Sequence, residues 1–208
     1  MQTSSSHSEA LRRAYDADVE RRGAMTPDEW RTDLIDEFAV AVRTSGGRSV
    51  LELGCGTGQL AQRMASHDLD IVATDLSPGN VQRTRERGVN AQIADFADLP
   101  FPDDTFDAAF GINSLIHAAP EELPAVLAEI SRVLRPGGRL LMVVWGGVDH
   151  QGPLDDEWLD PPRYFSFYTD EAALALDTPG FRRISFETLD VTEAGDDIHP
   201  QVITLEAI

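Results

Sequence analysis

Apolar residues follow two different periods along the chain. Five short segments are almost continuously apolar, which is typical of parallel strands buried on both faces. These predicted strands cover residues 49–53, 70–74, 90–94, 106–112 and 139–145. Between them, apolar residues recur every three to four positions and predict helices at about 59–66, 78–87 and 121–134. The alternation of strands and helices predicts an α/β fold with a parallel sheet covered by helices on both faces.

The segments before and after this core follow other patterns. Two helices are expected before it, at about 7–22 and 27–44, with Thr26 as the N-cap of the second and Pro27 as its first residue. We expect both helices to cap a ligand cleft. The last predicted elements are a helix and an antiparallel pair of edge strands, at about 170–177, 183–191 and 201–207.

A glycine stands at every second position in the loop after the first predicted strand. Side chains at Gly54, Gly56 and Gly58 would block the approach of a ligand to the backbone, and the following helix directs its free amides to the same place. The strand is therefore expected to end in a binding site. The dinucleotide fingerprint needs a third glycine where this chain has Gln59, and Glu52 would repel a pyrophosphate. The pattern favours a positively charged or zwitterionic ligand.

The same loop belongs to a longer series of motifs. The acidic residue and three glycines within 52–58 resemble the first motif of the class I S-adenosylmethionine-dependent methyltransferases. Four further segments resemble, in the same order, the second to fifth strands of that family with their loops: 71–77, 94–101, 106–117 and 129–140. The resemblance spans 49–145 and implies a Rossmann-like, three-layer α/β sandwich. It also implies a mostly parallel, seven-stranded sheet with the strand order 3-2-1-4-5-7-6.

The length of 208 residues fits a single domain with a substantial core. We expect residues 1–45 to form an N-terminal helical cap, 46–147 the cofactor-binding core, and 148–208 a substrate-side loop and the C-terminal strands. The resemblance implies that the cofactor is S-adenosyl-L-methionine, which leaves as S-adenosyl-L-homocysteine.

The predicted contacts to the nucleoside lie at the C-terminal ends of adjacent strands. Asp75, 21 positions after Gly54, suits a carboxylate that binds ribose hydroxyls; the alternative, a helix cap, is a task that Ser77 already performs. Asp95 is a candidate for accepting a hydrogen bond from the adenine amine or, alternatively, for an ordinary Asx turn. Phe96 is expected to wall the adenine pocket.

Other predicted contacts surround the base and the methionine part. Leu76 is expected to pack against the adenine, while Gly54 and Gly56 lie beneath the methionine part. Glu52 is expected to bind nearby backbone amides or, through water, the amino group. Asn113 offers its backbone carbonyl or its side chain to the same amino group.

Four more residues complete the picture around the cleft. Tyr15 and Trp30 lie on the predicted N-terminal helices, and each either packs there or reaches the cleft. Tyr15 resembles an early tyrosine-aspartate motif of small-molecule methyltransferases and joins the cofactor contacts, whereas Trp30 joins the substrate contacts. Cys55, the only cysteine, is expected to be a small residue under the ligand rather than a nucleophile, because no basic partner stands beside it. Gln59 opens the next helix and completes the cofactor set.

Methyl transfer from a sulfonium is an in-line displacement in which the enzyme mainly positions the reactants. His117 is the best-placed general base for a hydroxyl acceptor, and the alternative is a structural histidine. The acceptor wall is expected within 149–169, whose aromatic residues either close over the acceptor or attach the loop to the sheet. Arg163 meets either a substrate carboxylate or a nearby acid. The remaining predicted substrate contacts are Trp145, Tyr164 and Tyr168.

The chain carries 36 acidic residues and 17 basic residues, all of them arginine, for a formal net charge of −19. Such a charge repels a phosphate backbone, so we expect a small-molecule substrate and no nucleic-acid partner. Adaptation to high salt stays an open reading of this composition. No run suits a membrane helix or signal peptide, and no residue set has metal-ligand spacing. We expect a cytoplasmic, metal-independent monomer or homodimer.

The predicted function is S-adenosylmethionine-dependent methyl transfer to a small molecule at oxygen or nitrogen. Two alternatives stay open. One is a regulatory or assembly protein that binds the cofactor without catalysis, because the acceptor half of the site is less well defined than the donor half. The other is a nicotinamide-dependent oxidoreductase, which Gln59 and the lack of a lysine for a Tyr-x-x-x-Lys pair disfavour.

Overall fold

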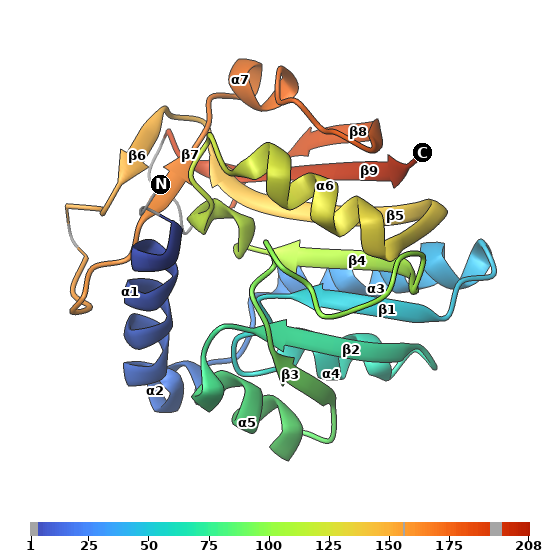
Figure 1. The fold of residues 1–208 in the computed structure, drawn as a ribbon, viewed down its shortest axis with the longest axis horizontal. Helices are drawn as coiled ribbons and strands as arrows, with labels where there is room; N and C mark the ends of the chain where they lie inside the picture. Colours follow the sequence, from blue (N-terminus) through green and yellow to red (C-terminus); the bar gives the residue numbers. More distant parts are fainter. Residues whose placement is uncertain (1–3, 156, 192–196) are drawn as a thin grey trace.

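Seven strands form the central sheet of the computed structural model, which describes residues 4–155, 157–191 and 197–208. Their order across the sheet is β3-β2-β1-β4-β5-β9-β8 (Figure 1). They are β1 (Ser49–Leu53), β2 (Asp70–Asp75), β3 (Asn90–Ile93), β4 (Phe106–Ile112), β5 (Leu134–Gly146), β8 (Phe181–Thr188) and β9 (His199–Ala207). Strands β1 to β5 are parallel, and β9 is antiparallel to β5 and β8. Counted along the chain, β8 and β9 are the sixth and seventh strands of this sheet, so the order is the one that the resemblance implies.

The parallel strands in the middle of the sheet end together at one edge. Glu52 of β1 lies opposite Ala73 of β2 and Phe110 of β4. Just beyond β1, the amide of Cys55 donates to the carbonyl of Thr74 over 2.8 Å, which holds the glycine loop beside the end of β2. The loops after β1, β2 and β4 therefore emerge side by side, as expected for a binding edge.

Helices cover both faces of the sheet. The longer ones that flank it are α3 (Glu29–Thr44), α4 (Gln59–Ala65), α5 (Pro78–Glu86) and α6 (Leu123–Val133). In Figure 1, α6 lies in front of the sheet, and α3 and α4 lie behind it. Buried residues of α3, α4 and α5 share one hydrophobic cluster, and those of α6 share another. In β1, Val50 joins the first cluster and Leu51 the second, which explains why the strand is apolar at consecutive positions.

The N-terminal helix predicted for 7–22 is two helices, α1 (Ser4–Ala17) and α2 (Val19–Gly23). Asp18 separates them, with a φ of −109°. Its buried carboxylate accepts hydrogen bonds of 2.7 and 2.6 Å from Nε and Nη2 of Arg21, a local interaction that competes with a continuous helix. Figure 1 shows α1 running across the edge toward which the parallel strands point, which is the position expected of a cap.

The helix α3 begins two residues later than predicted, and its buried residues pack on the sheet instead of over the cleft. Asp28, not Thr26, is its N-cap, so Pro27 is not the first helical residue. The backbone of Asp28 is extended, and its carbonyl accepts from the amides of Arg31 and Thr32. Its carboxylate pairs with Nε of Arg31 at 3.0 Å instead of capping the backbone. The chain therefore stays extended through the proline.

Several other helices and strands begin or end at residues that differ from the predicted ones. β5 begins at Leu134, five residues before the predicted start at 139, because Leu134 pairs with Phe106 ahead of a bulge. Gly137 forms this bend with a φ of +80°. α6 starts two residues late, after a turn in which the amide of Glu122 donates to Ala119. The last helix, α7 (Asp170–Leu174), is shorter than predicted, and β8 and β9 each begin two residues early.

The stretch expected to be an acceptor-side loop contains a second, small sheet. β6 (His150–Gly152) pairs antiparallel with β7 (Phe165–Phe167). Phe165 and Phe167 are buried and belong to the hydrophobic cluster under α6. A single turn of 3-10 helix, η1 (Leu115–His117), packs beside β7 after the end of β4. Phe165 and Phe167 thus attach this stretch to the core.

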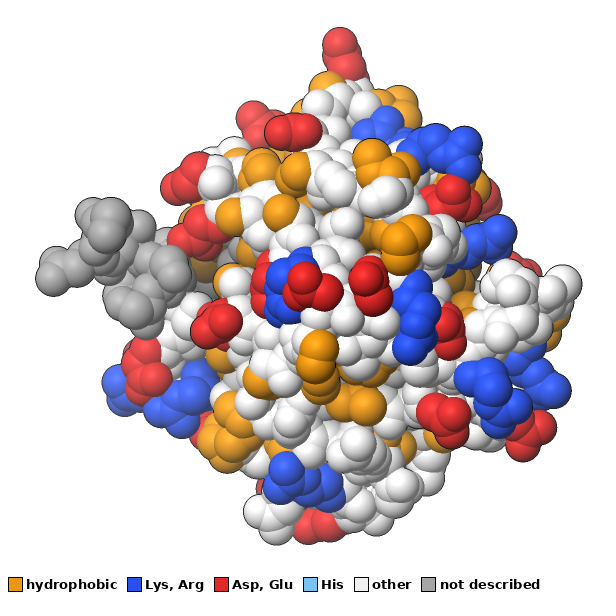
Figure 2. Space-filling model, turned by 45° about the vertical axis from the view of Figure 1, so that its right-hand side comes forward, with side chains coloured by type: hydrophobic (Ala, Val, Ile, Leu, Met, Phe, Trp, Pro, Cys, Tyr) orange, Lys and Arg blue, Asp and Glu red, His pale blue; other side chains and the backbone are white. Residues whose placement is uncertain are grey.

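The surface shows how the acidic chain distributes its charges. Figure 2 shows acidic and arginine side chains interspersed over one face of the molecule. Several arginines pair with acids three positions away on the same helix, as in Arg12–Glu9 at 2.7 Å and Arg83–Glu86 at 3.1 Å. Within the described residues, no helix combines the length and apolar character needed to cross a membrane.

Candidate functional site

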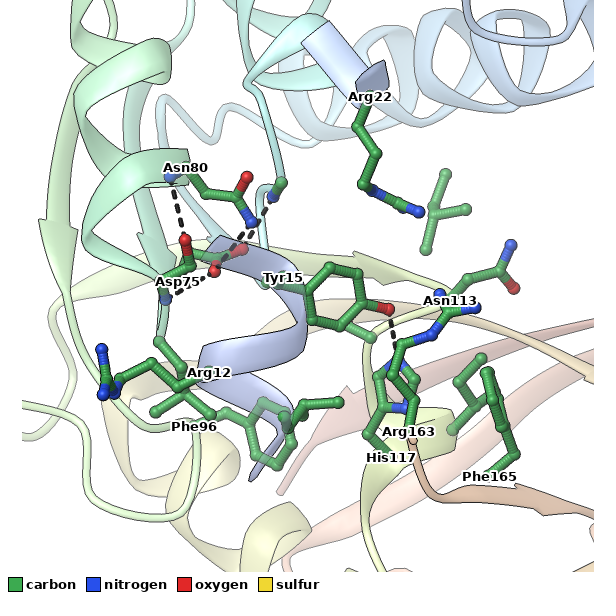
Figure 3. A pocket seen from close by; sticks show the side chains of 18 of the residues that line it. Arg12, Tyr15, Arg22, Asp75, Asn80, Phe96, Asn113, His117, Arg163 and Phe165 are labelled. Atoms are coloured by element: carbon green, nitrogen blue, oxygen red, sulfur yellow. Dashed lines mark hydrogen bonds between the residues drawn. The ribbon is translucent and has the colours of Figure 1, made fainter. Parts of the chain in front are cut away.

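A cavity of about 570 Å³ lies at the edge where β1, β2 and β4 end. The loops after these strands form its floor, α1 and α2 cover it, and β7 and the residues before it form a wall. Figure 3 shows side chains from all these elements pointing toward one another, among them Tyr15, Arg22, Asp75, Asn113 and His117. Residues from both ends of the chain thus meet in one cavity.

The three glycines of the loop have different reasons to be glycine. All have a positive φ, but a Cβ on Gly54 would lie 2.5 Å from the Cβ of Ser114, and a Cβ on Gly58 would lie 2.6 Å from Oγ1 of Thr84. These two positions are closed by the protein's own side chains. Only Gly56 has open space where a Cβ would stand. The prediction that all three admit a ligand is therefore wrong for Gly58, and Gly54 is constrained by Ser114 although it lines the cavity.

Asp75 is the organising carboxylate at the end of β2. Its Oδ2 accepts a 2.8 Å hydrogen bond from the amide of Gly56. Its Oδ1 accepts from the amide of Ser77 at 2.9 Å and from Nδ2 of Asn80 at 3.2 Å. Burial raises the pKa of Asp75, and these three hydrogen bonds oppose the rise. A carboxylate offers about four lone-pair sites, so Asp75 keeps acceptor capacity toward the cavity that it lines.

Among the buried side-chain oxygens that have no hydrogen-bond partner in the described residues, two belong to predicted cofactor contacts. One is Oε2 of Glu52, which lies under the loop and outside the cavity lining. Burial and the charge of Asp75 raise the pKa of Glu52 well above its usual value. The other is Oδ1 of Asn113, whose φ of +57° turns the chain at the end of β4 and which lines the cavity. A ligand that donates a hydrogen bond there would satisfy Asn113.

The predicted adenine contacts divide between two neighbouring spaces. Leu76 and Phe96 line both the main cavity and an adjoining one of about 290 Å³, whereas Asp95 lines only the smaller one. Oδ1 of Asp95 accepts from the amide of Ala97 at 2.9 Å, which is the Asx turn of the alternative interpretation. Its Oδ2 accepts from Oγ of Ser8 at 3.2 Å. The adenine contact of Asp95 stays a prediction.

Both ring nitrogens of His117 are engaged. Nδ1 lies 2.7 Å from the carbonyl oxygen of Tyr164, and Nε2 lies 2.6 Å from the hydroxyl of Tyr15. Because a carbonyl only accepts, Nδ1 carries the proton, and Nε2 accepts from the tyrosine hydroxyl. Burial and then the charges of Arg163 and Arg22 lower the pKa of His117 to about 4, against the effect of the Tyr164 hydrogen bond. His117 is therefore neutral at pH 7.

Two arginines flank the ring of Tyr15. The Cζ atoms of Arg22 and Arg163 lie 5.0 and 5.5 Å from the ring centroid. Nε of Arg163 donates to Oε2 of Glu157 at 2.9 Å. Of the two partners predicted for Arg163, a nearby acid is therefore the one that the structure shows. Burial lowers the pKa of Arg163, but its interactions with Tyr15 and Glu157 outweigh this effect, and the pKa is raised. The hydroxyl end of Tyr15 thus lies among positive charges.

Residues 50–138, from β1 to the bend in β5, match a family model described as a methyltransferase domain. The O-methyltransferase cnsE of Penicillium expansum is 32% identical over 180 residues, covering 80% of this chain and 62% of that protein. The 27-O-demethylrifamycin SV methyltransferase of Amycolatopsis mediterranei is 35% identical over 126 residues, covering 56% of this chain and 46% of that protein. The chain belongs to the class I S-adenosylmethionine-dependent methyltransferases.

This family member spans less than two thirds of the length of either curated relative. Its fold matches a solved structure of the Burkholderia thailandensis 1,6-didemethyltoxoflavin-N1-methyltransferase with bound 1,6-didemethyltoxoflavin and S-adenosylhomocysteine. The TM-score is 0.76 at 21% identity, covering 100% of this chain and 91% of that one. The [4+2]-cyclase SpnF matches with a TM-score of 0.67 at 25% identity, covering 85% of this chain and 80% of that one. Proteins with folds similar to this one are therefore named for different reactions.

The residues of this family member fit S-adenosylmethionine at the donor end of the cavity. Open space over Gly56, the remaining acceptor capacity of Asp75 and the unsatisfied Oδ1 of Asn113 face the same cavity. Leu76 and Phe96 supply apolar surface beside them. A ligand with hydroxyl groups, a cationic amine and a flat base matches this set of donors, acceptors and apolar walls.

Two predicted cofactor residues direct their side chains elsewhere. Sγ of Cys55 lies 3.4 Å from Oγ1 of Thr84 in the hydrophobic cluster behind the sheet, and burial raises the pKa of this thiol. Nε2 of Gln59 donates to the carbonyls of Arg22 and Met25, both at 3.2 Å. Cys55 is thus a core residue, and Gln59 ties α4 to the helical cap.

Three predicted substrate contacts also lie outside the main cavity. Trp30 packs edge-to-face on Trp145, with ring centroids 6.1 Å apart, and only Trp145 lines the cavity. Tyr164 borders the smaller cavity and contributes its carbonyl to His117. The hydroxyl of Tyr168 is buried without a partner among the described residues, and burial raises the pKa of Tyr168 to about 12. Of these, Trp30 and Tyr164 support lining residues, and Tyr168 is part of the core.

Sequence reasoning missed the arginines that line the cavity beside Arg163. Arg22 lies on α2 and projects into the cavity in Figure 3. A signal was available, since a lysine-free acidic chain has few cations and several of them stand on the predicted cap. Periodicity alone does not show which side of a cap faces inward. Among the described residues, no group of three or more histidine, cysteine or acidic side chains is arranged to hold a metal ion.

Proposed function

We propose that this protein transfers a methyl group from S-adenosyl-L-methionine to an oxygen or nitrogen atom of a small molecule. The proposal depends on one observation, the single cavity in which Gly56, Asp75 and Asn113 meet the Tyr15–His117 pair. S-adenosyl-L-methionine supplies the methyl group on a sulfonium ion. The features suited to this donor and a hydrogen-bonded pair able to handle a proton face the same enclosed space.

At the donor end, we assign the nucleoside to the residues after β2 and β3. Asp75 accepts hydrogen bonds from the ribose hydroxyls, and Leu76 and Phe96 pack against the adenine. Oδ1 of Asn113 accepts from the amino group of the methionine part, which removes an unsatisfied buried oxygen. Gly56 leaves the backbone open beneath this part.

At the acceptor end, aromatic surface and a positive charge surround the remaining space. Trp145, Phe165 and Phe167 line it, together with Arg163. These residues support an acceptor with an apolar or aromatic body. Curated relatives are named as O-methyltransferases, and the solved Burkholderia enzyme is named as an N1-methyltransferase. Both names support a heteroatom as the methylated atom.

Catalysis by this arrangement comes mainly from positioning. Holding two reactants in an attack geometry supplies on the order of 7–11 kcal/mol, whereas a general base adds roughly 10²- to 10⁴-fold. The cap of α1 and α2 closes over the site and limits water, and Gln59 holds it to α4. A neutral His117, hydrogen-bonded to Tyr15, is able to take up a proton at pH 7.

Two experiments test this function. Calorimetry with S-adenosylmethionine, S-adenosylhomocysteine and NADH is expected to show binding of the first two and none of NADH. A panel of hydroxyl- and amine-bearing metabolites, assayed through release of homocysteine from S-adenosylhomocysteine, is expected to yield a methylated product. Preference for NADH, or cofactor binding with no product from any panel member, contradicts the proposal.

A second function remains, a protein that binds the cofactor without transferring its methyl group. The similarity to SpnF favours it, since a similar fold there carries the name of a cyclase. The metabolite panel separates the two functions directly. We further propose that the protein is a cytoplasmic, metal-independent monomer or homodimer. Activity that persists in the presence of a chelator would test the metal independence, and the mass in solution would test the oligomeric state.

A further inference from the structure

We propose that Tyr15 is the residue that contacts the O–H or N–H group of the acceptor, and that His117 acts through Tyr15. This inference rests on the proposed methyl transfer and assigns its acceptor side. Tyr15 is a catalytic residue in this scheme, because its oxygen touches the reacting group. His117 is a positioning residue that also receives the proton from Tyr15.

The direction of two consecutive hydrogen bonds carries the inference. The carbonyl of Tyr164 accepts from Nδ1 of His117 at 2.7 Å, which leaves the lone pair on Nε2. This lone pair accepts the hydroxyl proton of Tyr15 at 2.6 Å. The lone pairs of His117 are therefore not free to receive a proton from the acceptor directly. The oxygen of Tyr15, whose proton points to His117, keeps two lone pairs; Arg163 donates toward one of them, and the other is left as an acceptor toward the cavity.

The surroundings of Tyr15 favour an oxygen that accepts. Arg22 and Arg163 lie on its ring at 5.0 and 5.5 Å, and both raise the cost of a proton on His117. Their charges stabilise negative charge on the phenol oxygen as it gives up its proton. Figure 3 shows the hydroxyl of Tyr15 between His117 and the side chains of Arg163 and Asn113. The acceptor group thus meets an oxygen placed next to the donor end of the cavity.

The reaction balances along this chain of hydrogen bonds. A lone pair of the acceptor oxygen or nitrogen forms the new bond to the methyl carbon, and the carbon–sulfur bond breaks with its electron pair on sulfur. The new bond makes the proton on an acceptor oxygen strongly acidic. That proton passes to the oxygen of Tyr15 while the proton of Tyr15 passes to Nε2 of His117. Because the pKa of His117 is about 4, the charged ring then releases its proton to water when the site opens.

The selectivity follows from the same geometry. A group that only accepts hydrogen bonds, such as a carbonyl, finds no donor in Tyr15, because the hydroxyl proton already bonds His117. A hydroxyl or amine finds an acceptor and is held with its lone pair free for the methyl group. Tyr15 therefore selects acceptors that carry O–H or N–H at the reacting atom.

Kinetics of variants test this order of contacts with the acceptor that the metabolite panel identifies. Tyr15→Phe keeps the ring between the arginines and removes only the oxygen, so kcat is expected to fall by roughly 10²-fold. His117→Gln can still accept from Tyr15 but takes no proton, so kcat is expected to fall while KM stays within about threefold. The double variant is expected to be no slower than Tyr15→Phe alone, because the two residues act as one unit.

The controls remove the same groups outside the cavity. Tyr168→Phe deletes a buried hydroxyl that has no partner among the described residues, and His67→Gln deletes a ring that pairs with Asp36 at 2.8 Å. Both are expected to keep the wild-type kcat. Wild-type kcat in Tyr15→Phe, or losses that multiply in the double variant, would overturn the proposal. Equal kcat for His117→Gln and the wild type would show that His117 receives no proton during the reaction.

A measurement without an acceptor separates this inference from the proposed function. In the complex with S-adenosylhomocysteine at pH 7, ¹⁵N NMR of histidine-labelled protein is expected to show His117 neutral, with the proton on Nδ1. Comparison with the spectrum of His117→Gln assigns the signal. The opposite tautomer, or a charged ring, would overturn the inference even if methyl transfer occurs. The expected tautomer with no product from the panel would instead overturn the methyl transfer on which the catalytic roles rest.

Discussion

The donor end and the acceptor end of the cavity are built in different ways. The donor end consists of residues that directly follow adjacent parallel strands, such as Gly56 after β1, Asp75 at the end of β2 and Asn113 after β4. The acceptor end joins Tyr15 from α1 to His117 on η1, 102 positions apart in sequence. One end depends on backbone conformation set within a few residues, and the other depends on side chains from distant segments.

This difference teaches where the site is rigid and where it is adaptable. At the donor end, Gly54 is packed against Ser114 and Asp75 is held by three hydrogen bonds, so the positions are set by the sheet. At the acceptor end, the contacts of Tyr15 and Arg163 belong to a helical cap and an acceptor-side segment that the sheet does not include. Changes in acceptor chemistry therefore need few changes in the sheet.

The largest expected effect tests the rigidity of the donor end. Gly54→Ala places a Cβ 2.5 Å from that of Ser114 at a positive φ, and is expected to cost about 4 kcal/mol of unfolding free energy, measured by urea denaturation. Gly56→Ala is the matched control, because it has the positive φ without the clash. It is expected to cost about 1–2 kcal/mol and to weaken S-adenosylhomocysteine binding. Equal losses of stability would contradict this account of the loop.

The second effect concerns the pH dependence of the acceptor end. Folded His117 has a pKa of about 4, so it stays neutral while the unfolded chain takes up a proton near pH 6.5. Stability from this residue is complete above pH 6.5 and is lost as the pH falls toward 4, by about 3 kcal/mol. Tyr15 and Arg22 from the cap, with Arg163 and Tyr164 from the acceptor-side segment, surround the ring.

Denaturation of wild type and His117→Gln at pH 7 and at pH 4.5 measures this contribution. The variant is expected to lose less stability on acidification than the wild type does. His67→Gln, which removes a half-buried imidazole outside the cavity, is the matched control and is expected to leave the contribution of His117 in place. An identical pH dependence for His117→Gln and the wild type would show that the imidazole is not kept neutral by its surroundings.

The third effect measures ligand affinity at the donor end. Asp75→Ala removes the proposed ribose acceptor and the partner of Gly56, and is expected to weaken S-adenosylhomocysteine binding by about 2 kcal/mol in calorimetry. Asp70→Ala, at the exposed opposite end of the same strand, is the matched control and is expected to bind normally. Unchanged affinity in Asp75→Ala would show that the ribose lies elsewhere.

The smallest effect concerns the connection between the two ends. Gln59→Leu removes two hydrogen bonds to the carbonyls of Arg22 and Met25, and is expected to lower the local stability of α2 by about 1 kcal/mol. Hydrogen exchange of the α2 amides measures it. Gln62→Leu, which loses a single bond to the carbonyl of Arg87, is expected to leave α2 unchanged. Equal exchange rates of the α2 amides in both variants would show that Gln59 does not hold the cap to α4.

Prediction from the sequence worked well where the relevant interactions are local. The cap of α5 by Ser77 follows from one residue type beside Pro78, and the structure shows Oγ of Ser77 accepting from the amide of Asn80. The same logic was wrong at α3, where Asp28 replaced Thr26 because its carboxylate pairs with Arg31. Local rules compete at such ends, and a single side-chain contact decides between them.

Prediction was weaker where a side chain could pack in either of two directions. Cys55 stands inside the glycine motif, yet its thiol turns away to Thr84 behind the sheet. Trp30 stands at the start of α3, yet it reaches the cavity only through Trp145. In both cases the residue type and position were read correctly, but its direction depends on which partner fills the space beside it.

The amino-acid sequence by itself determined the α/β class, the order of the core elements and the place of the glycine loop with Asp75. Hydrophobic period and strand-end residues carry this information, because each depends on neighbours a few positions away. Only the tertiary structure decided that Tyr15 and His117 form a hydrogen-bonded pair and that Arg22 and Arg163 surround it. The contacts of Tyr15 with His117 and Arg163 join segments far apart in the chain, and their direction depends on packing that no local pattern encodes.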